Sequence, residues 1–122
     1  MLLAGNYRCI TPDGMRPIKE AIHDDVELSK NIYNWARQLC QKLGASETDL
    51  VPFEKYAAAA QSLGSPSSAA RALFAGAKNI ERVDLLMQAV AAKQGIQSDA
   101  VDRIVDLVNQ QLEKNRSLPK AA

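Results

Sequence analysis

The densest group of side chains able to take part in chemistry lies between residues 65 and 84. Two neighbouring hydroxyls, Ser67 and Ser68, follow Pro66, and charged and amide side chains come after them: Arg71, Lys78, Asn79, Glu81, Arg82 and Asp84. If each end of this segment begins a helix, N–H groups and hydroxyls at one helix start would face a carboxylate at the other, which can orient a small polar substrate. A structural interpretation is also open, in which the serines and the acidic residues only stabilise two helix starts.

The other reactive residue types are few. His23 is the only histidine, and beside Asp24 at a predicted helix end an imidazolium simply complements the helix dipole. Cys9 and Cys40 are the only cysteines. Two thiols and one histidine make a poor zinc set, and a disulfide-stabilised secreted domain normally has more cysteines. We therefore expect two reduced thiols and no metal site.

Signatures of a complete enzyme are missing from the sequence. No predicted strand is followed by a glycine-rich turn and a helix, so the chain has no nucleotide-binding unit of its own. A Walker loop and a nucleophile elbow are also missing. No nucleophile and base can be paired, and the chain is therefore not expected to be an enzyme by itself.

Length and charge limit the expected partners. The chain has 122 residues, the size of one domain, and 15 basic residues nearly balance 14 acidic ones. Such a balance gives no bulk field that would attract nucleic acid or anionic lipid, so neither is expected as a partner. No apolar run approaches the roughly twenty residues that span a bilayer, and the N-terminus resembles no signal sequence. The expected location is the cytoplasm.

We expect helices to position these side chains, because apolar residues recur at helical spacing and the alternation typical of strands is nearly absent. A short helix is expected over about 16–23 and a long one from Asp24 or Asp25 to Leu43, with Gly44 ending it. The long helix has one apolar stripe, in which Trp35 is the expected core anchor: Ile32, Trp35, Ala36, Leu39, Cys40 and Leu43.

The second half of the sequence predicts further helices. Ser46 is expected to cap a helix that continues to Ala60, and a short helix follows over about 68–74. Asn79 is expected to cap a helix that ends at Gly95, and Ser98 to cap the last one. We therefore predict an all-α fold, a single compact bundle of five to six helices over residues 1–122. Residues 1–14 are expected to form an irregular lead-in and residues 115–122 a mobile tail.

One part of the sequence resembles the C-terminal helical domain of ketopantoate reductases (2-dehydropantoate 2-reductases). The resemblance rests on the run Pro66-Ser67-Ser68, Ala75-Gly76 and Ile80-Glu81-Arg82-Val83-Asp84, followed by an apolar helix that closes at Gly95-Ile96. A turn at Pro12-Asp13-Gly14 and a long helix ending at Leu43-Gly44 also fit, so the resemblance covers about residues 5–112. It implies a fold similar to the C-terminal domain of 6-phosphogluconate dehydrogenase.

The resemblance also implies a function. In that family an N-terminal Rossmann domain binds NADPH, and the helical domain closes the cleft in which a 2-keto acid is reduced. By position, Ser68 or Ser67 matches the serine that binds the substrate carboxylate, and Asn6 matches a family asparagine. Glu81 matches the catalytic glutamate, although an ungapped count back from Gly95 places Asn79 there. The family's proton-donating lysine has no counterpart before Asn6.

Two hypotheses follow from these observations. In the first, the chain is the substrate-binding and dimerisation domain of an NADP-dependent 2-keto acid reductase, and an upstream Rossmann domain or a second copy of the chain is its partner. Its cofactor would be bound by the parent enzyme and not by this domain alone. In the second, the chain is a stand-alone helical interaction module without catalytic activity, as indicated by the wide apolar surface of the helix over Ile80 to Val90.

Overall fold

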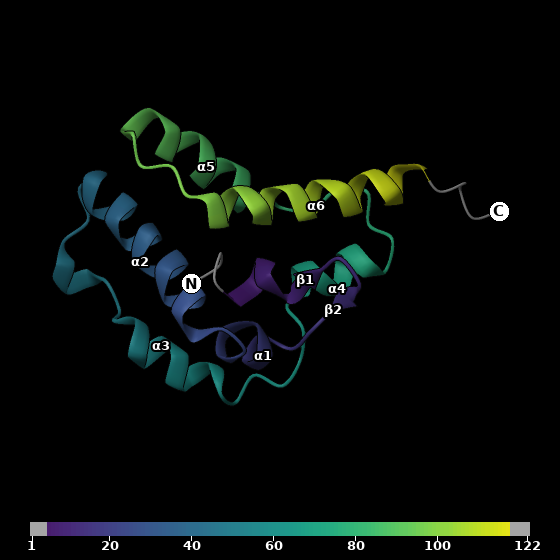
Figure 1. Cartoon of the computed structure of the whole chain (residues 1–122), viewed down its shortest axis with the longest axis horizontal. Helices are drawn as coiled ribbons and strands as arrows, with labels where there is room; N and C mark the ends of the chain where they lie inside the picture. Colours follow the sequence, from purple (N-terminus) through teal and green to yellow (C-terminus); the bar gives the residue numbers. More distant parts are fainter. Residues whose placement is uncertain (1–4, 118–122) are drawn as a thin grey trace.

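The structure is a computed structural model that describes residues 5–117, and helices dominate it (Figure 1). The elements follow one another as a 3₁₀ helix η2 (Tyr7–Cys9), strands β1 (Ile10–Thr11) and β2 (Gly14–Met15), α1 (Ile18–His23), α2 (Val26–Lys42), the 3₁₀ helix η3 (Glu47–Asp49), α3 (Phe53–Ala60), α4 (Ser68–Phe74), α5 (Val83–Gln94) and α6 (Asp99–Ser117). The prediction of a mostly helical chain with five to six α-helices is confirmed.

The helices surround the start of the chain. Figure 1 shows α6 as a long rod, with α5 along its outer side and η2, the hairpin and α4 on its other side. α2 lies at one end and α1 and α3 lie farthest from α5. Tyr7, Cys9 and Ile10 are buried in the shared core. The part of the expected lead-in that the structure describes is therefore a folded core element, because apolar side chains there gain by burial.

The long helix α2 forms as its sequence predicts. The Asp25 carboxylate accepts a hydrogen bond from the Leu28 N–H at 3.0 Å and caps the helix. The apolar stripe faces the core, where Ile32, Trp35 and Leu39 are buried. After Lys42 the chain leaves the helix, and Gly44 has a φ of +103°, which few residues other than glycine adopt. The predicted core position of Trp35 is confirmed, and its indole Nε1 donates to the Ile96 carbonyl.

Two predicted helix starts are wrong. The segment after Ser46 forms the short helix η3, and α3 begins only at Phe53 after Pro52, because proline favours an extended residue before it and tolerates the first turn. Asn79 does not cap α5, which begins at Val83 after Arg82. The amide oxygen of Asn79 instead accepts a hydrogen bond from Arg116 at 3.2 Å.

The last helix is longer than its apolar stripe. The expected mobile tail begins at Asn115, but α6 continues to Ser117, and the remaining tail positions, 118–122, lie outside the described residues. Asn115 is buried, and its Nδ2 donates to the carbonyls of Leu73 at 2.8 Å and Ala77 at 2.7 Å. This polar contact, which an apolar period cannot reveal, holds the end of α6 against α4. Between residues 5 and 117 no helix combines the length and apolar character needed to cross a membrane.

Candidate functional site

Three of the four predicted site residues lie around one hollow. Asn6, Ser67 and Ser68 line a depression of about 400 Å³ together with Arg71 and the loop before α4. Ser68 and Arg71 are exposed, whereas Asn6 is half-buried. The hollow therefore offers a hydroxyl and a guanidinium to solvent on the first turn of α4.

The hydroxyl of Ser67 is used within the protein. Its side chain is only 3% exposed, and its Oγ accepts a hydrogen bond from the Ala70 N–H at 3.2 Å. The same Oγ donates to the Asn6 carbonyl at 2.6 Å. Ser67 therefore caps α4 and attaches it to the start of the chain, which is the structural role that the sequence also allowed.

Glu81 does not line this hollow. Its side chain is exposed in the segment before α5. Its carbonyl accepts a hydrogen bond from the Tyr7 hydroxyl at 2.6 Å, and that hydroxyl accepts one from the Val83 N–H at 3.0 Å. Asn79, the other candidate for the family's glutamate, is also outside the lining. The serines and the glutamate candidates thus do not share a hollow.

The buried acid of the segment is Asp84. Its carboxylate is 0% exposed, and Arg82 donates to both of its oxygens at 2.9 Å, from Nε and from Nη2. The remaining Nη1 of Arg82 donates to Asn109 of α6 at 2.8 Å. This bidentate pair fixes the start of α5 on α6 and presents no free acid for catalysis.

His23 and Cys9 also have structural roles. Nε2 of His23 donates to the Ala57 carbonyl at 2.9 Å and connects α1 to α3. The buried thiol of Cys9 donates to the Gly5 carbonyl at 3.1 Å, and burial raises the pKa of this thiol. Cys9 and Cys40 are both free, as expected. Across residues 5–117 no group of three or more potential metal-ligating His, Cys, Asp or Glu side chains occurs.

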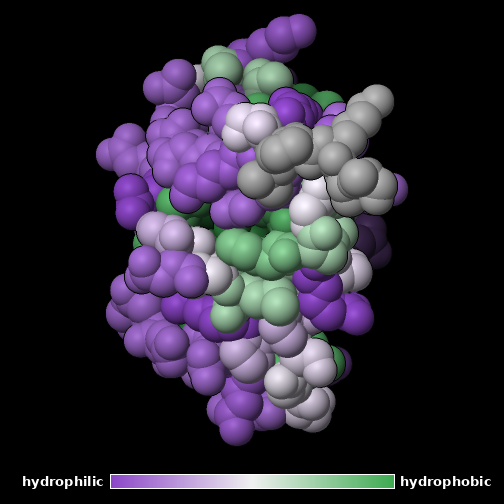
Figure 2. All heavy atoms as spheres, turned by 90° about the vertical axis from the view of Figure 1, so that its right-hand side faces the viewer, coloured by the Kyte–Doolittle hydropathy of each residue, from purple (hydrophilic) through white to green (hydrophobic). Residues whose placement is uncertain are grey.

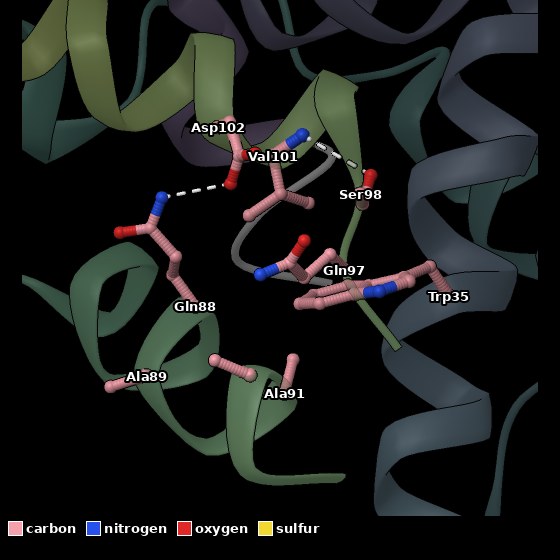
Figure 3. A pocket seen from close by; sticks show the side chains of 9 residues that line it. Trp35, Gln88, Ala89, Ala91, Gln97, Ser98, Val101 and Asp102 are labelled. Atoms are coloured by element: carbon pink, nitrogen blue, oxygen red, sulfur yellow. Dashed lines mark hydrogen bonds between the residues drawn. The ribbon is translucent and has the colours of Figure 1, made fainter. Parts of the chain in front are cut away.

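A second hollow separates α5 from its neighbours. It has a volume of about 330 Å³ and a floor of small side chains that includes Ala89 and Ala91 (Figure 3). Figure 3 shows the carboxamide of Gln97 beside the Trp35 indole and the side chain of Gln88 reaching from α5 to α6. Nε2 of Gln88 donates to Asp102 at 2.8 Å. The inner side of α5 packs on the core through Val83, Met87, Val90 and Ala91, and Gln88 adds a polar contact with α6.

The solvent-facing side of α5 is apolar. We call Leu85, Leu86, Ala89 and Ala92 the outward face of α5, because all four are exposed; Ala89 and Ala92 also border the hollow, whereas Leu85 and Leu86 lie outside its lining. Leu86 is 62% exposed, and Lys93 is the only charged residue among the exposed positions of α5. The exposed positions of α2 and α6 are instead mostly polar, as expected for helices that face water. A further apolar belt lies at the end of the molecule formed by α4 and the hairpin (Figure 2).

A third hollow, larger than the two above, is a groove of about 960 Å³ between α2 and α6, with the start of the described chain on a third side. Three arginines line it: Arg8, Arg16 and Arg103. The sequence does not predict this site, because its residues come from three distant segments and form no motif. Only the folded chain brings them together.

Comparison of the chain with protein-family models, with curated proteins and with solved structures finds no match. Among the hollows and surfaces of the described residues, the outward face of α5 differs most from a monomeric helical domain, because its apolar side chains are exposed where such a domain normally has polar ones.

Proposed function

We propose that the chain is a helical protein-interaction module that associates with a second copy of itself through the outward face of α5. The observation that carries this proposal is that Leu85, Leu86, Ala89 and Ala92 are exposed together on one helix. Burying such side chains in an interface is favourable by about 25 cal/mol per Å². A helix that only completed a monomeric core would have polar residues at these positions.

A second copy fits this face better than an arbitrary partner because the face is complementary to itself. A two-fold axis at the level of residue 87 would place two α5 helices antiparallel. Leu85 would then lie opposite Ala89 of the partner subunit, so that a large side chain meets a small one. The same axis would bring the exposed Glu81 at one end of the face toward the oppositely charged Lys93 of the partner subunit.

The expected association is weak. Four side chains on one helix bury much less than the about 800 Å² per partner of a standard stable interface. Sedimentation velocity over a series of protein concentrations should therefore show a monomer–dimer equilibrium. Leu86→Glu should raise the dimer Kd at least tenfold, because it places a charge in the centre of the apolar face.

A matched control and a charge exchange make this test specific. Leu63→Glu alters a leucine that is 42% exposed in the α3–α4 loop, outside this face, and should leave the dimer Kd unchanged. Glu81→Lys alone should weaken the dimer, and adding Lys93→Glu should restore it. A chain that stays monomeric at all concentrations, or equal effects of Leu86→Glu and Leu63→Glu, would overturn the proposal.

A second candidate function is the substrate-side domain of an NADP-dependent 2-keto acid reductase, with the 6-phosphogluconate dehydrogenase-like fold that the motif resemblance implies. Its support is the hollow that Asn6, Ser67 and Ser68 share with Arg71, since a guanidinium beside a hydroxyl can bind a carboxylate. Titration of the ¹⁵N-labelled chain with 2-oxoisovalerate should then shift the amide signals of residues 67–71, and Ser68→Ala should weaken the effect. Unchanged spectra would remove this candidate.

A further inference from the structure

We propose that the groove between α2 and α6 binds the carboxylate of a small aliphatic acid, with Arg8 as the residue that receives the charge. This inference is independent of the proposed dimer, because none of the groove residues belongs to the outward face of α5.

The first argument is the position of Arg8. Its side chain lines the groove although the residue is only 9% exposed. Nη1 donates to the Ala21 carbonyl at 2.8 Å and to the Ser29 hydroxyl. Among residues 5–117 no other hydrogen bond to the guanidinium occurs and no carboxylate lies within ion-pair distance of it. A buried charge without a counter-ion is unfavourable, so an anion that binds in the groove would provide the counter-ion that Arg8 lacks among the described residues.

The surroundings of Arg8 strengthen this argument. Burial lowers the pKa of Arg8, and the positive charge of Arg16 lowers it further. Asp25 and Asp24 act in the opposite direction, but each has a smaller effect than Arg16. Nε and Nη2, which have no partner among the described residues, have the fork geometry that matches a carboxylate.

The walls and the rim restrict the ligand further. The walls are aliphatic and come from both helices: Leu28 and Ile32 of α2, and Ile104 and Leu107 of α6. The rim carries Asp25, Glu27 and Asp99 as well as Arg16 and Arg103, so that a polyanion would meet repulsion there. A singly charged acid with a short aliphatic chain fits this groove, because its chain can contact the aliphatic walls and its carboxylate can pair with Arg8.

Hexanoate is a suitable probe, with hexylamine and 1-hexanol as controls of equal chain length. Titration of the ¹⁵N-labelled chain should give saturable shifts at groove residues such as Thr11, Asn31 and Ala100 with hexanoate. Hexanol should bind at least tenfold more weakly, because a charge-assisted hydrogen bond is roughly twice as strong as a neutral one. Equal binding of hexanol or hexylamine, tighter binding of inorganic phosphate, or the lack of saturable shifts would overturn the proposal.

Variants separate recognition from folding. Arg8→Lys keeps the charge but loses the fork, and should weaken hexanoate binding about tenfold in a chain that circular dichroism shows to be folded. Since Arg8 also bonds the α1–α2 junction, Leu107→Asp provides a second variant that leaves Arg8 in place and adds a negative charge to the half-buried wall. It should likewise weaken binding at least tenfold, whereas the exposed Arg71→Met outside the groove should not. Leu86→Glu should bind hexanoate like the wild type, which distinguishes failure of this site from failure of the dimer.

Discussion

The Arg82–Asp84 pair shows how a single residue can depend on its neighbour for charge balance. Arg82→Met would leave the carboxylate of Asp84 without a cation in a site that is 0% exposed. We expect the free energy of unfolding to fall by about 3–5 kcal/mol, the usual cost of breaking a buried ion pair on one side only. Urea unfolding followed by circular dichroism measures this loss.

Glu81 provides the control for that experiment. It lies next to Arg82, but its side chain is exposed, and only its backbone carbonyl makes the bond to Tyr7. Glu81→Gln should therefore change the free energy of unfolding by less than about 0.5 kcal/mol. If both variants lose equal stability, the loss does not come from an unpaired Asp84 carboxylate, and Arg82 is not its essential counter-ion.

The same residues show what the sequence could predict about the candidate site. The pattern correctly indicated a helix start at Ser67 and Ser68, because a serine cap is a local interaction. It could not predict that Ser67 would donate to Asn6, 61 positions away, or that Asp84 rather than Glu81 would be buried. Long-range partners decide which polar groups stay free, and one sequence does not record them. Arg8 and its groove could not be predicted for the same reason.

Individual elements differ in how far their own sequence determines them. The predictions of α2 and α6 agree with the structure over most of their length, because apolar stripes at helical spacing are strong and local signals. α5 starts later than the sequence predicts, because Arg82 binds Asp84 and Asn109 of α6, and the Asn79 amide oxygen accepts from Arg116. The sequence does not predict the hairpin β1–β2, because each of its strands has only two residues.

The end of α6 leads to a prediction about an element. Asn115 donates to the carbonyl of Leu73 in the last turn of α4 and to that of Ala77 beyond its end. Asn115→Leu keeps the side-chain volume but removes both bonds. Leu73 still accepts from the Gly76 N–H, whereas Ala77 loses its side-chain donor, so the free energy of unfolding should fall by about 1–3 kcal/mol. Hydrogen exchange should also become faster in α4 than in α3. Glu113→Leu, at an exposed position of α6 whose side chain makes no hydrogen bond or ion pair among the described residues, is the control, and an equal loss of stability in both variants would contradict this role.

The behaviour of the whole molecule at high pH follows from groups that are buried in its common core. Burial raises the pKa of Cys9 and of Tyr7, and it raises the pKa of Tyr56 to about 12. The folded chain therefore holds these protons at a pH at which the unfolded chain has released them. Stability contributed by these groups is complete below their unfolded pKa values and is lost as the pH rises through the folded ones.

We therefore expect the urea midpoint of the wild-type chain to fall progressively from about pH 8.5, where an unfolded thiol ionises, and more steeply above pH 10. Tyr56 alone should account for up to about 2–3 kcal/mol of the loss between pH 10 and 12, because one pKa unit corresponds to about 1.4 kcal/mol. Tyr56→Phe can lower stability at pH 7, but its midpoint should depend less on pH above pH 10 than that of the wild type. If the two curves stay parallel up to pH 11.5, the hydroxyl of Tyr56 does not set the alkaline limit of the fold.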